Sequence, residues 1–281
     1  VWDTSAGVTA NPATLITNAP STCEFLIVSP QSRYAIALGA HTGSVSDPLF
    51  IRWCSQNDYT DWTPTETNTA GDTRLNEGSR ILGGSLTNSG EIAVFTDTAM
   101  YIMHYLGDEN FIYSTRLGAT SSGIISPHAA GTWSDLVWYM GEENFFEYDG
   151  RVRILDCDVE SHVFEDINRQ QRDKIFCGIN RQWQELIWFY PSKNSTEIDR
   201  YVAFNWKERT WNLGTLSRTT WGDISEVYAS PYAFDATGKL YTHERPDMAA
   251  PGAFLESGAF QIGEGDDVMH INRIIPDFER I

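Results

Sequence analysis

The feature that most constrains the fold is a pattern of short, aromatic-rich bursts separated by turn residues. Residues 133–155, "WSDLVWYMGEENFFEYDGRVRIL", contain three such bursts, divided by the polar stretch 141–144 and by Asp149-Gly150. Bursts of this length, bounded by Gly, Asp or Asn, are typical of antiparallel strands joined by hairpin turns. Bulky aromatic and β-branched side chains also pack well on a pleated surface. The stretch therefore predicts three consecutive strands of a meander.

The same strand-turn-strand pattern recurs in residues 33–56, 90–107, 184–214 and 230–244, and "VWDTSAG" at the start resembles the end of another copy. Successive copies are separated by 57, 44, 50 and 45 residues when they are anchored at Ala37, Val94, Trp138, Trp188 and Ala233. Repeats of about 40 to 50 residues, each worth about four strands, are typical of propeller blades, whereas solenoid repeats are usually shorter or helical. We expect residues 80–87 to form the innermost strand of one blade, followed by strands at 91–97, 99–106 and 110–117.

The sequence thus predicts an all-β fold, a β-propeller of four-stranded antiparallel blades, with five blades plus partial strands from the two ends and few helices. The aromatic content of 13% would fill the layers between blades, since each blade is one sheet thick. We expect one domain of blades over residues 1–246, the first blade partial. Residues 247–281 would be a strand-rich segment that closes the propeller or leads into a further region. Because both ends lie within strand-like segments, we interpret the chain as a fragment of a longer polypeptide.

Composition narrows the class of protein. No apolar run approaches the roughly 20 residues that cross a bilayer, so no membrane span is expected. The four cysteines, Cys23, Cys54, Cys157 and Cys177, contain no C-x-x-C pair, and we expect free thiols, with two disulfides as the open alternative. The net charge of −18 repels nucleic acid at long range and argues against tight DNA binding by a broad basic face.

One segment concentrates basic residues: "RQQRDKIFCGINR" carries Arg169, Arg172, Lys174 and Arg181. Two interpretations are open. The side chains can flank a blade strand and pair with nearby acids, or they can form a patch that contacts DNA phosphates.

Motifs for catalysis are sparse. The six histidines occur singly, and no H-E-x-x-H, G-x-S-x-G or phosphate-binding glycine loop is present. In a strand, Asp156, Asp158 and Glu160 would share one face, as a calcium site requires, but the glycine turn and downstream Glu of a calcium loop are missing. Residues 55–62, "SQNDYTDW", nearly match the Asp-box turn of sialidase-type propellers, with Tyr59 where that motif has Gly. We predict no catalytic residue, metal or cofactor.

Several longer strings resemble one protein family. Residues 47–72, 91–103, 117–130, 163–182, 199–221 and 273–279 are similar to the packaged-DNA stabilisation proteins of short-tailed bacteriophages, also described as tail accessory or tail nozzle proteins. The resemblance covers most of the chain. The matching strings are strand and turn pieces, and none of them carries a catalytic residue.

The resemblance implies a structural virion protein, assembled in the bacterial host cytoplasm, that forms a six-fold ring below the portal and its adaptor. Such a ring would retain packaged DNA and form the conduit for genome ejection, with the adaptor and distal tail proteins as partners and only transient contact with double-stranded DNA. An acidic conduit would let DNA slide without adhering.

Two other hypotheses remain. The first is a tail-associated propeller that binds or cleaves glycans. If it cleaves them, it would release reducing sugar and would need two carboxylates about 5 to 9.5 Å apart. The clustered candidates are Asp156, Asp158, Asp266 and Asp267. An interaction propeller of cellular origin would instead be a monomer that binds a cellular partner.

Overall fold

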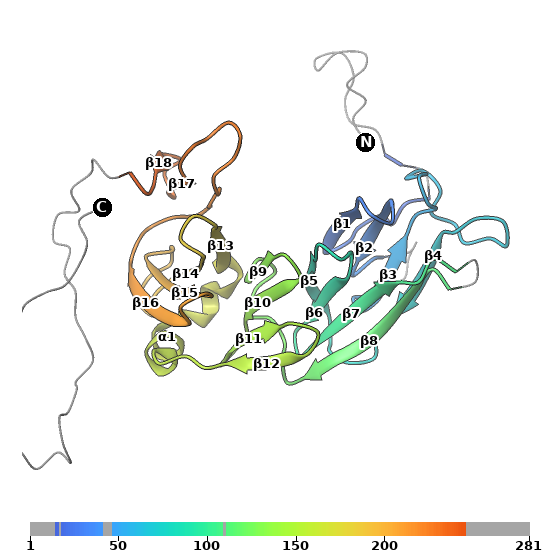
Figure 1. Cartoon of the computed structure of the whole chain (residues 1–281). Coiled ribbons are helices and arrows are strands. Elements are labelled where there is room, and N and C mark those ends of the chain that lie inside the picture. Colours follow the sequence, from blue (N-terminus) through green and yellow to red (C-terminus); the bar gives the residue numbers. More distant parts are fainter. Residues whose placement is uncertain (1–14, 17, 42–46, 109–110, 246–281) are drawn as a thin grey trace, which may run out of the picture.

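The computed structural model describes residues 15–16, 18–41, 47–108 and 111–245. These residues form four four-stranded antiparallel sheets, each built from strands in chain order, followed by a two-stranded hairpin. Figure 1 shows the sheets side by side, from the blue first sheet to the orange fourth. The strands of the first two sheets are β1 (Phe25–Ser29), β2 (Tyr34–Leu38), β3 (Phe50–Trp53), β4 (Gly71–Arg74), β5 (Ile81–Leu86), β6 (Ile92–Thr96), β7 (Ala99–Tyr105) and β8 (Tyr113–Thr120).

The remaining elements continue the same order. They are β9 (Ala130–Trp133), β10 (Leu136–Met140), β11 (Phe145–Tyr148), β12 (Val152–Leu155), α1 (Glu160–Asp166), the 3-10 helix η2 (Arg169–Lys174), β13 (Phe176–Asn180), β14 (Glu185–Tyr190), β15 (Arg200–Asn205), β16 (Thr210–Thr215), β17 (Tyr232–Phe234) and β18 (Leu240–Thr242). The meander predicted for residues 133–155 is confirmed as β10, β11 and β12. The four strands predicted between residues 80 and 117 are β5 to β8.

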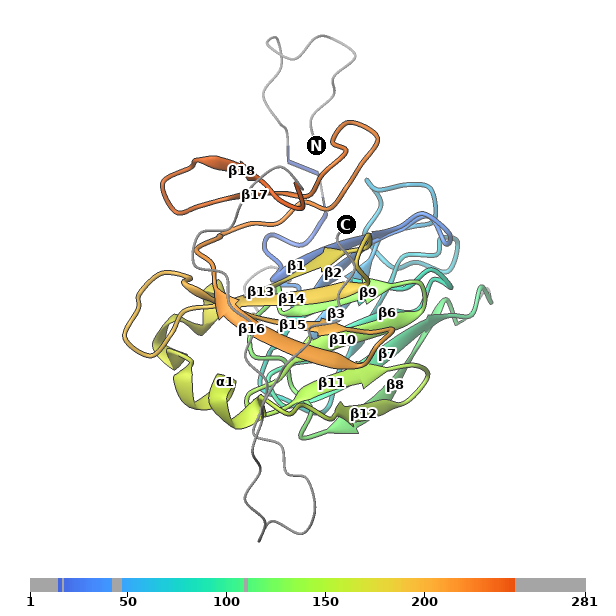
Figure 2. The same cartoon turned by 60° about the vertical axis from the view of Figure 1, so that its left-hand side comes forward.

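The first strand of each sheet lies at the centre of the arrangement. Strand β1 contacts β5, β5 contacts β9, and β9 contacts β13, while later strands lie progressively further out. Figure 2 shows the sheets stacked face to face. Sheets that meet through their first strands and diverge toward their last are propeller blades, so the all-β propeller class predicted from the sequence is confirmed.

A fifth blade is present in part. The backbone N–H of Gly222 donates to the carbonyl of Tyr232 over 2.7 Å, and the N–H of Tyr232 donates back over 2.8 Å. Residues 219–222 therefore occupy the inner position beside β17, and β18 follows outside. The described residues thus hold four complete blades and three strand positions of a fifth. The copy at "VWDTSAG" and the segment 247–281 lie outside the described residues.

Both faces of a central strand are buried, as expected for a blade between two neighbours. In β6, Ile92 and Val94 pack in the apolar layer shared with the first sheet, whereas Ala93 and Phe95 pack in the layer shared with the third. The aromatic side chains fill these layers: the rings of Phe145 and Trp188 lie 4.9 Å apart between the third and fourth sheets. Large side chains buried this way each contribute about 1.5 to 3 kcal/mol of hydrophobic stabilisation.

The blades converge so closely at the centre that two inner strands use glycine at the contact. A Cβ atom at Gly131 of β9 would lie 2.7 Å from Cδ2 of Leu186, and one at Gly178 of β13 would lie 2.6 Å from Cγ of Trp221. These distances are shorter than any van der Waals contact, so the next blade can approach only because no side chain intervenes.

The segment between the third and fourth sheets differs from one expectation. If Asp156, Asp158 and Glu160 lay in a strand, they would share one face, but β12 ends at Leu155 and α1 begins at Glu160. The helix buries Val163 and is followed by the buried Ile167, so an apolar residue every fourth position anchors it. No group of three His, Cys, Asp or Glu side chains in the described part of the chain could hold a metal ion.

Residues 55–62, which nearly match an Asp box, form the expected turn between β3 and β4. Oδ1 of Asp58 accepts the backbone N–H of Thr60 over 2.9 Å, and Nε1 of Trp62 donates to the carbonyl of Tyr59 over 2.7 Å. Trp62 is buried at 3% exposure, so the turn anchors its loop on the first blade. The four cysteines are free thiols in the structure.

Candidate functional site

Three of the four predicted phosphate-contact residues lie on or at the end of η2, and each is bound to an acid. Nη1 of Arg169 and Nη1 of Arg172 each lie 2.7 Å from a different carboxylate oxygen of Glu142. Nζ of Lys174 lies 2.6 Å from Oε1 of Glu197 and also donates to the carbonyl of Thr196. Glu142 belongs to the turn between β10 and β11, so the two arginine pairs connect η2 to the third blade.

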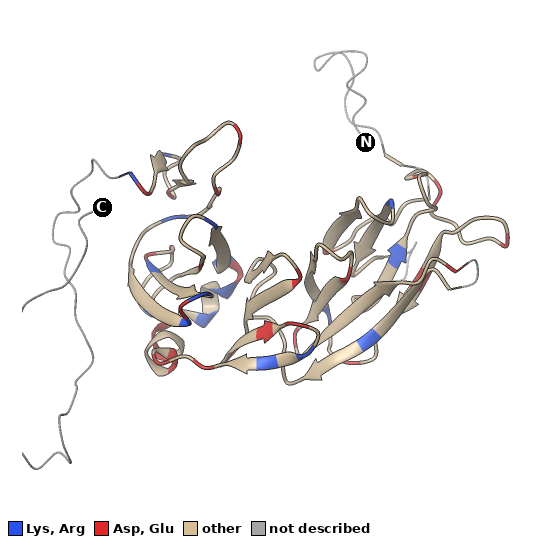
Figure 3. Cartoon of the chain, in the orientation of Figure 1, with Lys and Arg blue, Asp and Glu red and all other residues tan. Residues whose placement is uncertain are grey.

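The fourth predicted residue lies apart from the others. Arg181 follows β13, whereas Lys174 precedes it. The whole strand, which rises about 3.3 Å per residue, therefore separates the two residues. Nε of Arg181 bonds to Asp223, and its guanidinium lies 5.6 Å from the ring centre of Trp133. The structure therefore brings three of the residues together and leaves Arg181 at the opposite end of the inner strand. Figure 3 shows basic and acidic positions interspersed over the blades.

A first cavity lies along the centre of the blades. It has a volume of about 820 Å³ and touches the inner position of every blade. Its lining includes Phe25 of β1, Ser85 of β5, Ala130 of β9, Cys177 of β13 and Thr220 beside β17. This cavity is the space that the converging inner strands leave around the pseudo-axis. Its wall also includes Asp173, Lys174 and Glu197. The positive charge of Lys174 is neutralised there by Glu197.

A second cavity, of about 500 Å³, lies between the fourth sheet and the partial fifth blade. Alternation along the strands turns Glu185 and Ile187 of β14 and Tyr201 and Asn205 of β15 toward it. The register pairs Glu185 with Asn205, which places these two side chains on the same face. The strands of the fifth blade are only three residues long, so they leave part of the fourth sheet's outer face open.

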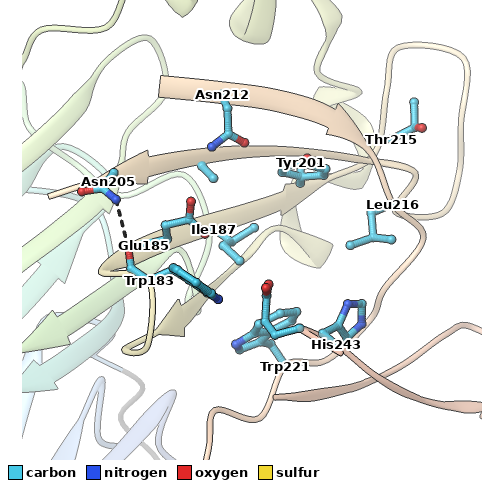
Figure 4. A pocket seen from close by; sticks show the side chains of 12 residues that line it. Trp183, Glu185, Ile187, Tyr201, Asn205, Asn212, Thr215, Leu216, Trp221 and His243 are labelled. Atoms are coloured by element: carbon cyan, nitrogen blue, oxygen red, sulfur yellow. Dashed lines mark hydrogen bonds between the residues drawn. The ribbon is translucent and has the colours of Figure 1, made fainter. Parts of the chain in front are cut away.

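The other wall of this second cavity comes from the fifth blade. Trp221 and His243 lie opposite the fourth sheet, and their rings pack 4.9 Å apart (Figure 4). Trp183 precedes β14 in the turn and is 39% exposed. Nε1 of Trp221 donates to the carbonyl of Ile179 over 2.8 Å, which fixes the indole over β13.

Two carboxylates, Glu185 and Glu244, line this cavity, and its lining among residues 15–245 as described contains no Lys or Arg. Burial raises the pKa of Glu185, and the negative charge of Glu244 raises it further. Burial, followed by the nearby Arg218, lowers the pKa of His243 to about 4, so the imidazole is neutral at pH 7. The cavity is therefore acidic, with aromatic walls. We refer to it below as the acidic aromatic cavity.

None of the residues in this cavity was predicted from the sequence to form a site. One signal was available: in "ELIWFY" Glu185 shares the Ile187 and Phe189 face of a strand whose other positions are apolar, and a charge on such a face is unusual. Of the carboxylates considered for glycan cleavage, Asp156 and Asp158 lie outside both cavities, and Asp266 and Asp267 lie outside the described residues.

Comparisons with known proteins identify no family for this chain. No family model matches the chain, and no curated protein matches it. Solved structures that it resembles include the Dos1 propeller, with 9% identity and a TM-score of 0.46, covering 81% of this chain and 60% of that one. The chain thus spans less than two thirds of that propeller's length.

Two further solved structures are similar at the same level. A protein from Lactobacillus plantarum has 11% identity and a TM-score of 0.38, with coverage of 80% of this chain and 84% of that one. A luciferin-regenerating enzyme has 8% identity and a TM-score of 0.34, covering 80% and 87%. At these identities and TM-scores, the likenesses say nothing about activity. In the part of the chain that the structure describes, no helix is long and apolar enough to span a membrane.

Proposed function

We propose that the chain is a structural subunit of a short bacteriophage tail. In this proposal it forms a six-fold ring, a tail nozzle, below the portal and its adaptor, retains packaged DNA and provides the conduit for genome ejection. The sequence strings similar to tail nozzle proteins support it. Five of the six strings fall on the described blades, and the string at 273–279 lies outside them.

The observation that carries the proposal is the pairing of the basic cluster. All four residues considered for phosphate contact, Arg169, Arg172, Lys174 and Arg181, are bound to carboxylates of the same chain. A phosphate would have to displace Glu142, Glu197 or Asp223 to reach them. With a net charge of −18, such a surface allows DNA to pass closely without adhering, which a conduit requires.

The packing of the blades supplies a second property that a tail component needs. Both faces of β6 are buried in apolar layers, so the sheets support one another and the body is stiff. Loops at both ends of each blade then form surfaces for ring neighbours, for the adaptor and for distal tail proteins.

Imaging of labelled virions tests the proposal. A short peptide tag inserted at Gly150 would be tolerated, because this residue lies in an exposed turn and has no neighbouring atom within 4 Å of a Cβ position. We expect six tags in a ring directly below the portal adaptor of short-tailed particles. Tags located on fibres, or virions that lack the chain, would contradict the proposal.

A glycan-binding role on the same tail is the second candidate. The exposed Trp183 beside Glu185 and Tyr201 favours it, because indole faces stack on sugar rings and carboxylates accept sugar hydroxyls. Glycan cleavage would additionally require Glu185 and Glu244 to act as acid and base. Reducing-sugar release from host polysaccharide that is lost in Glu185→Gln and Glu244→Gln would establish glycan cleavage.

A further inference from the structure

We infer that the acidic aromatic cavity binds an organic cation, an alkylammonium or guanidinium group. The group can belong to a free amine or to a Lys or Arg side chain of a docking protein. This inference does not depend on the proposed tail function, because it uses only the side chains between the fourth sheet and the fifth blade.

The first step is the charge of the cavity. Glu185 has no Lys, Arg or His within salt-bridge distance among the described residues, although it is half-buried. A half-buried carboxylate without a partner is costly, and a second carboxylate, Glu244, in the same cavity adds like-charge repulsion. An entering cation would relieve both costs.

Arg218, a basic side chain near the cavity, is already engaged. Nε of Arg218 donates to Nε2 of His243 over 3.1 Å, and its guanidinium stacks on Tyr241 at 3.8 Å from the ring centre. Because Nε2 of His243 accepts this hydrogen bond, it carries no proton, and the neutral imidazole adds no positive charge to the cavity at pH 7. Neither Arg218 nor His243 therefore neutralises Glu185.

A buried acceptor without a donor lies next to the cavity-lining Glu244. Asn180 of β13 is fully buried and donates from Nδ2 to Oε1 of Glu244 over 3.3 Å. Its Oδ1 has no hydrogen-bond partner among the residues that the structure describes. A buried acceptor without a donor is uncommon in native proteins and marks a place where a donor is missing.

The aromatic walls make the ligand an organic cation in particular. Trp183, Tyr201 and Trp221 line the cavity, and the faces of such rings attract ammonium and guanidinium groups within about 6 Å. A metal ion fits less well, because calcium takes six to eight oxygen ligands and this cavity offers two carboxylates. Anions are repelled. The volume of about 500 Å³ has room for an alkyl chain as well as for its charged end.

The test uses the intact chain and isothermal titration calorimetry with defined probes. The probes are butylammonium and Nα-acetyl-lysine N-methylamide, each compared with an uncharged partner of similar shape, 1-butanol and Nα-acetyl-norleucine N-methylamide. Methyl glucoside serves as the neutral sugar. Glu185→Gln removes the unpaired charge with little change in shape. Glu208→Gln is the matched control, because Glu208 is an exposed acid of the same sheet, in the β15–β16 turn, outside the cavity.

We expect both cations to bind and their uncharged partners to bind at least about tenfold more weakly, with a similar loss in Glu185→Gln and no change in Glu208→Gln. If capped lysine binds at least as tightly as butylammonium, the site accepts a side chain of a docking protein. If only butylammonium binds, the ligand is a free amine. The inference is overturned if neither cation binds, if Glu185→Gln binds them as well as the wild type, or if methyl glucoside binds more tightly than both.

Discussion

Arg209 donates a hydrogen bond from Nη1 to Oε2 of Glu147 over 2.9 Å and thereby ties the fourth blade to the third. The same oxygen accepts Nε1 of Trp138 over 3.0 Å, and Nη2 of Arg153 lies 3.6 Å from Oε1. Glu147 is only 8% exposed, so its charge depends on these partners. The ring of Trp206, next to this contact, stacks on Trp138 at 5.7 Å. Polar and aromatic contacts thus join the two blades at one place.

Replacing Glu147 by Gln should weaken this junction. The amide still accepts from Trp138, but Arg209 loses its counter-charge and Arg153 keeps only its pair with Asp149, so we expect a loss of about 1 to 3 kcal/mol in the free energy of unfolding. Urea denaturation monitored by tryptophan fluorescence measures it. Glu142→Gln is the control, since Glu142 also pairs with two arginines but is much less buried than Glu147, and it should cost under about 1 kcal/mol. Equal losses in the two variants would refute the special role of Glu147.

Gly178→Ala should disturb the contact between the fourth and fifth blades. The added Cβ would lie 2.6 Å from Cγ of Trp221, and overpacking of this kind typically costs about 1 to 3 kcal/mol. Trp221→Ala removes the clashing ring, so Gly178→Ala should cost less in that background. A double-mutant cycle by chemical denaturation measures the coupling. Strictly additive losses would show that the indole does not limit this approach.

Stability should fall in mild acid because of His243. Its pKa in the folded chain is about 4, against an ordinary value of 6.5, so the unfolded chain takes up the proton first as pH falls. Its contribution is complete above about pH 6.5 and is lost as pH decreases toward 4. His243→Phe keeps a ring on Trp221 but cannot titrate. Denaturation at pH 7 and pH 4.5 should therefore show a smaller acid-induced loss in the variant, and equal losses would contradict this account.

Replacement of Arg169, Arg172, Lys174 and Arg181 by Ser tests whether these residues contact phosphate in an assembled ring. Folding should survive, because each exposed ion pair contributes about 0 to 1 kcal/mol. Each phosphate contact would be weak, because the phosphate must displace a paired carboxylate, but a ring multiplies such contacts, so virions that carry the change should leak DNA or eject it at an altered rate. Because Arg181 lies apart from the others, Arg181→Ser alone should have a smaller effect. Normal packaging, retention and ejection would show that the four residues only pair with their own acids.

Ring assembly should strengthen with salt. Chains of net charge −18 repel one another, and screening over about 8 Å at physiological ionic strength reduces that repulsion. Analytical ultracentrifugation between low and moderate salt should show more oligomer as salt rises, and the portal adaptor should have the same effect as a template. Association that weakens with salt would mean that ion pairs between subunits, rather than repulsion, dominate.

The sequence alone determined the blades. Bursts such as "LVWYM" and "FFEY" became β10 and β11 at nearly the expected positions, because strand alternation and turn residues act between near neighbours along the chain. The anchor residues Ala37, Val94, Trp138 and Trp188 all lie in the second strand of a sheet. The spacing of the copies therefore reflected the blade repeat.

Tertiary structure decided which charges meet. Local sequence grouped Arg181 with Lys174, but β13 carries them to opposite ends, and their acids come from other turns, Asp223 and Glu197. It also placed Glu185 of the fourth blade beside Glu244, which follows β18, and the sequence gives no sign of that pairing. The reason is physical: strand formation depends on local periodicity, whereas contacts between blades depend on how closely whole sheets pack, and this distance is set by residues such as Gly178 and Trp221 in different repeats.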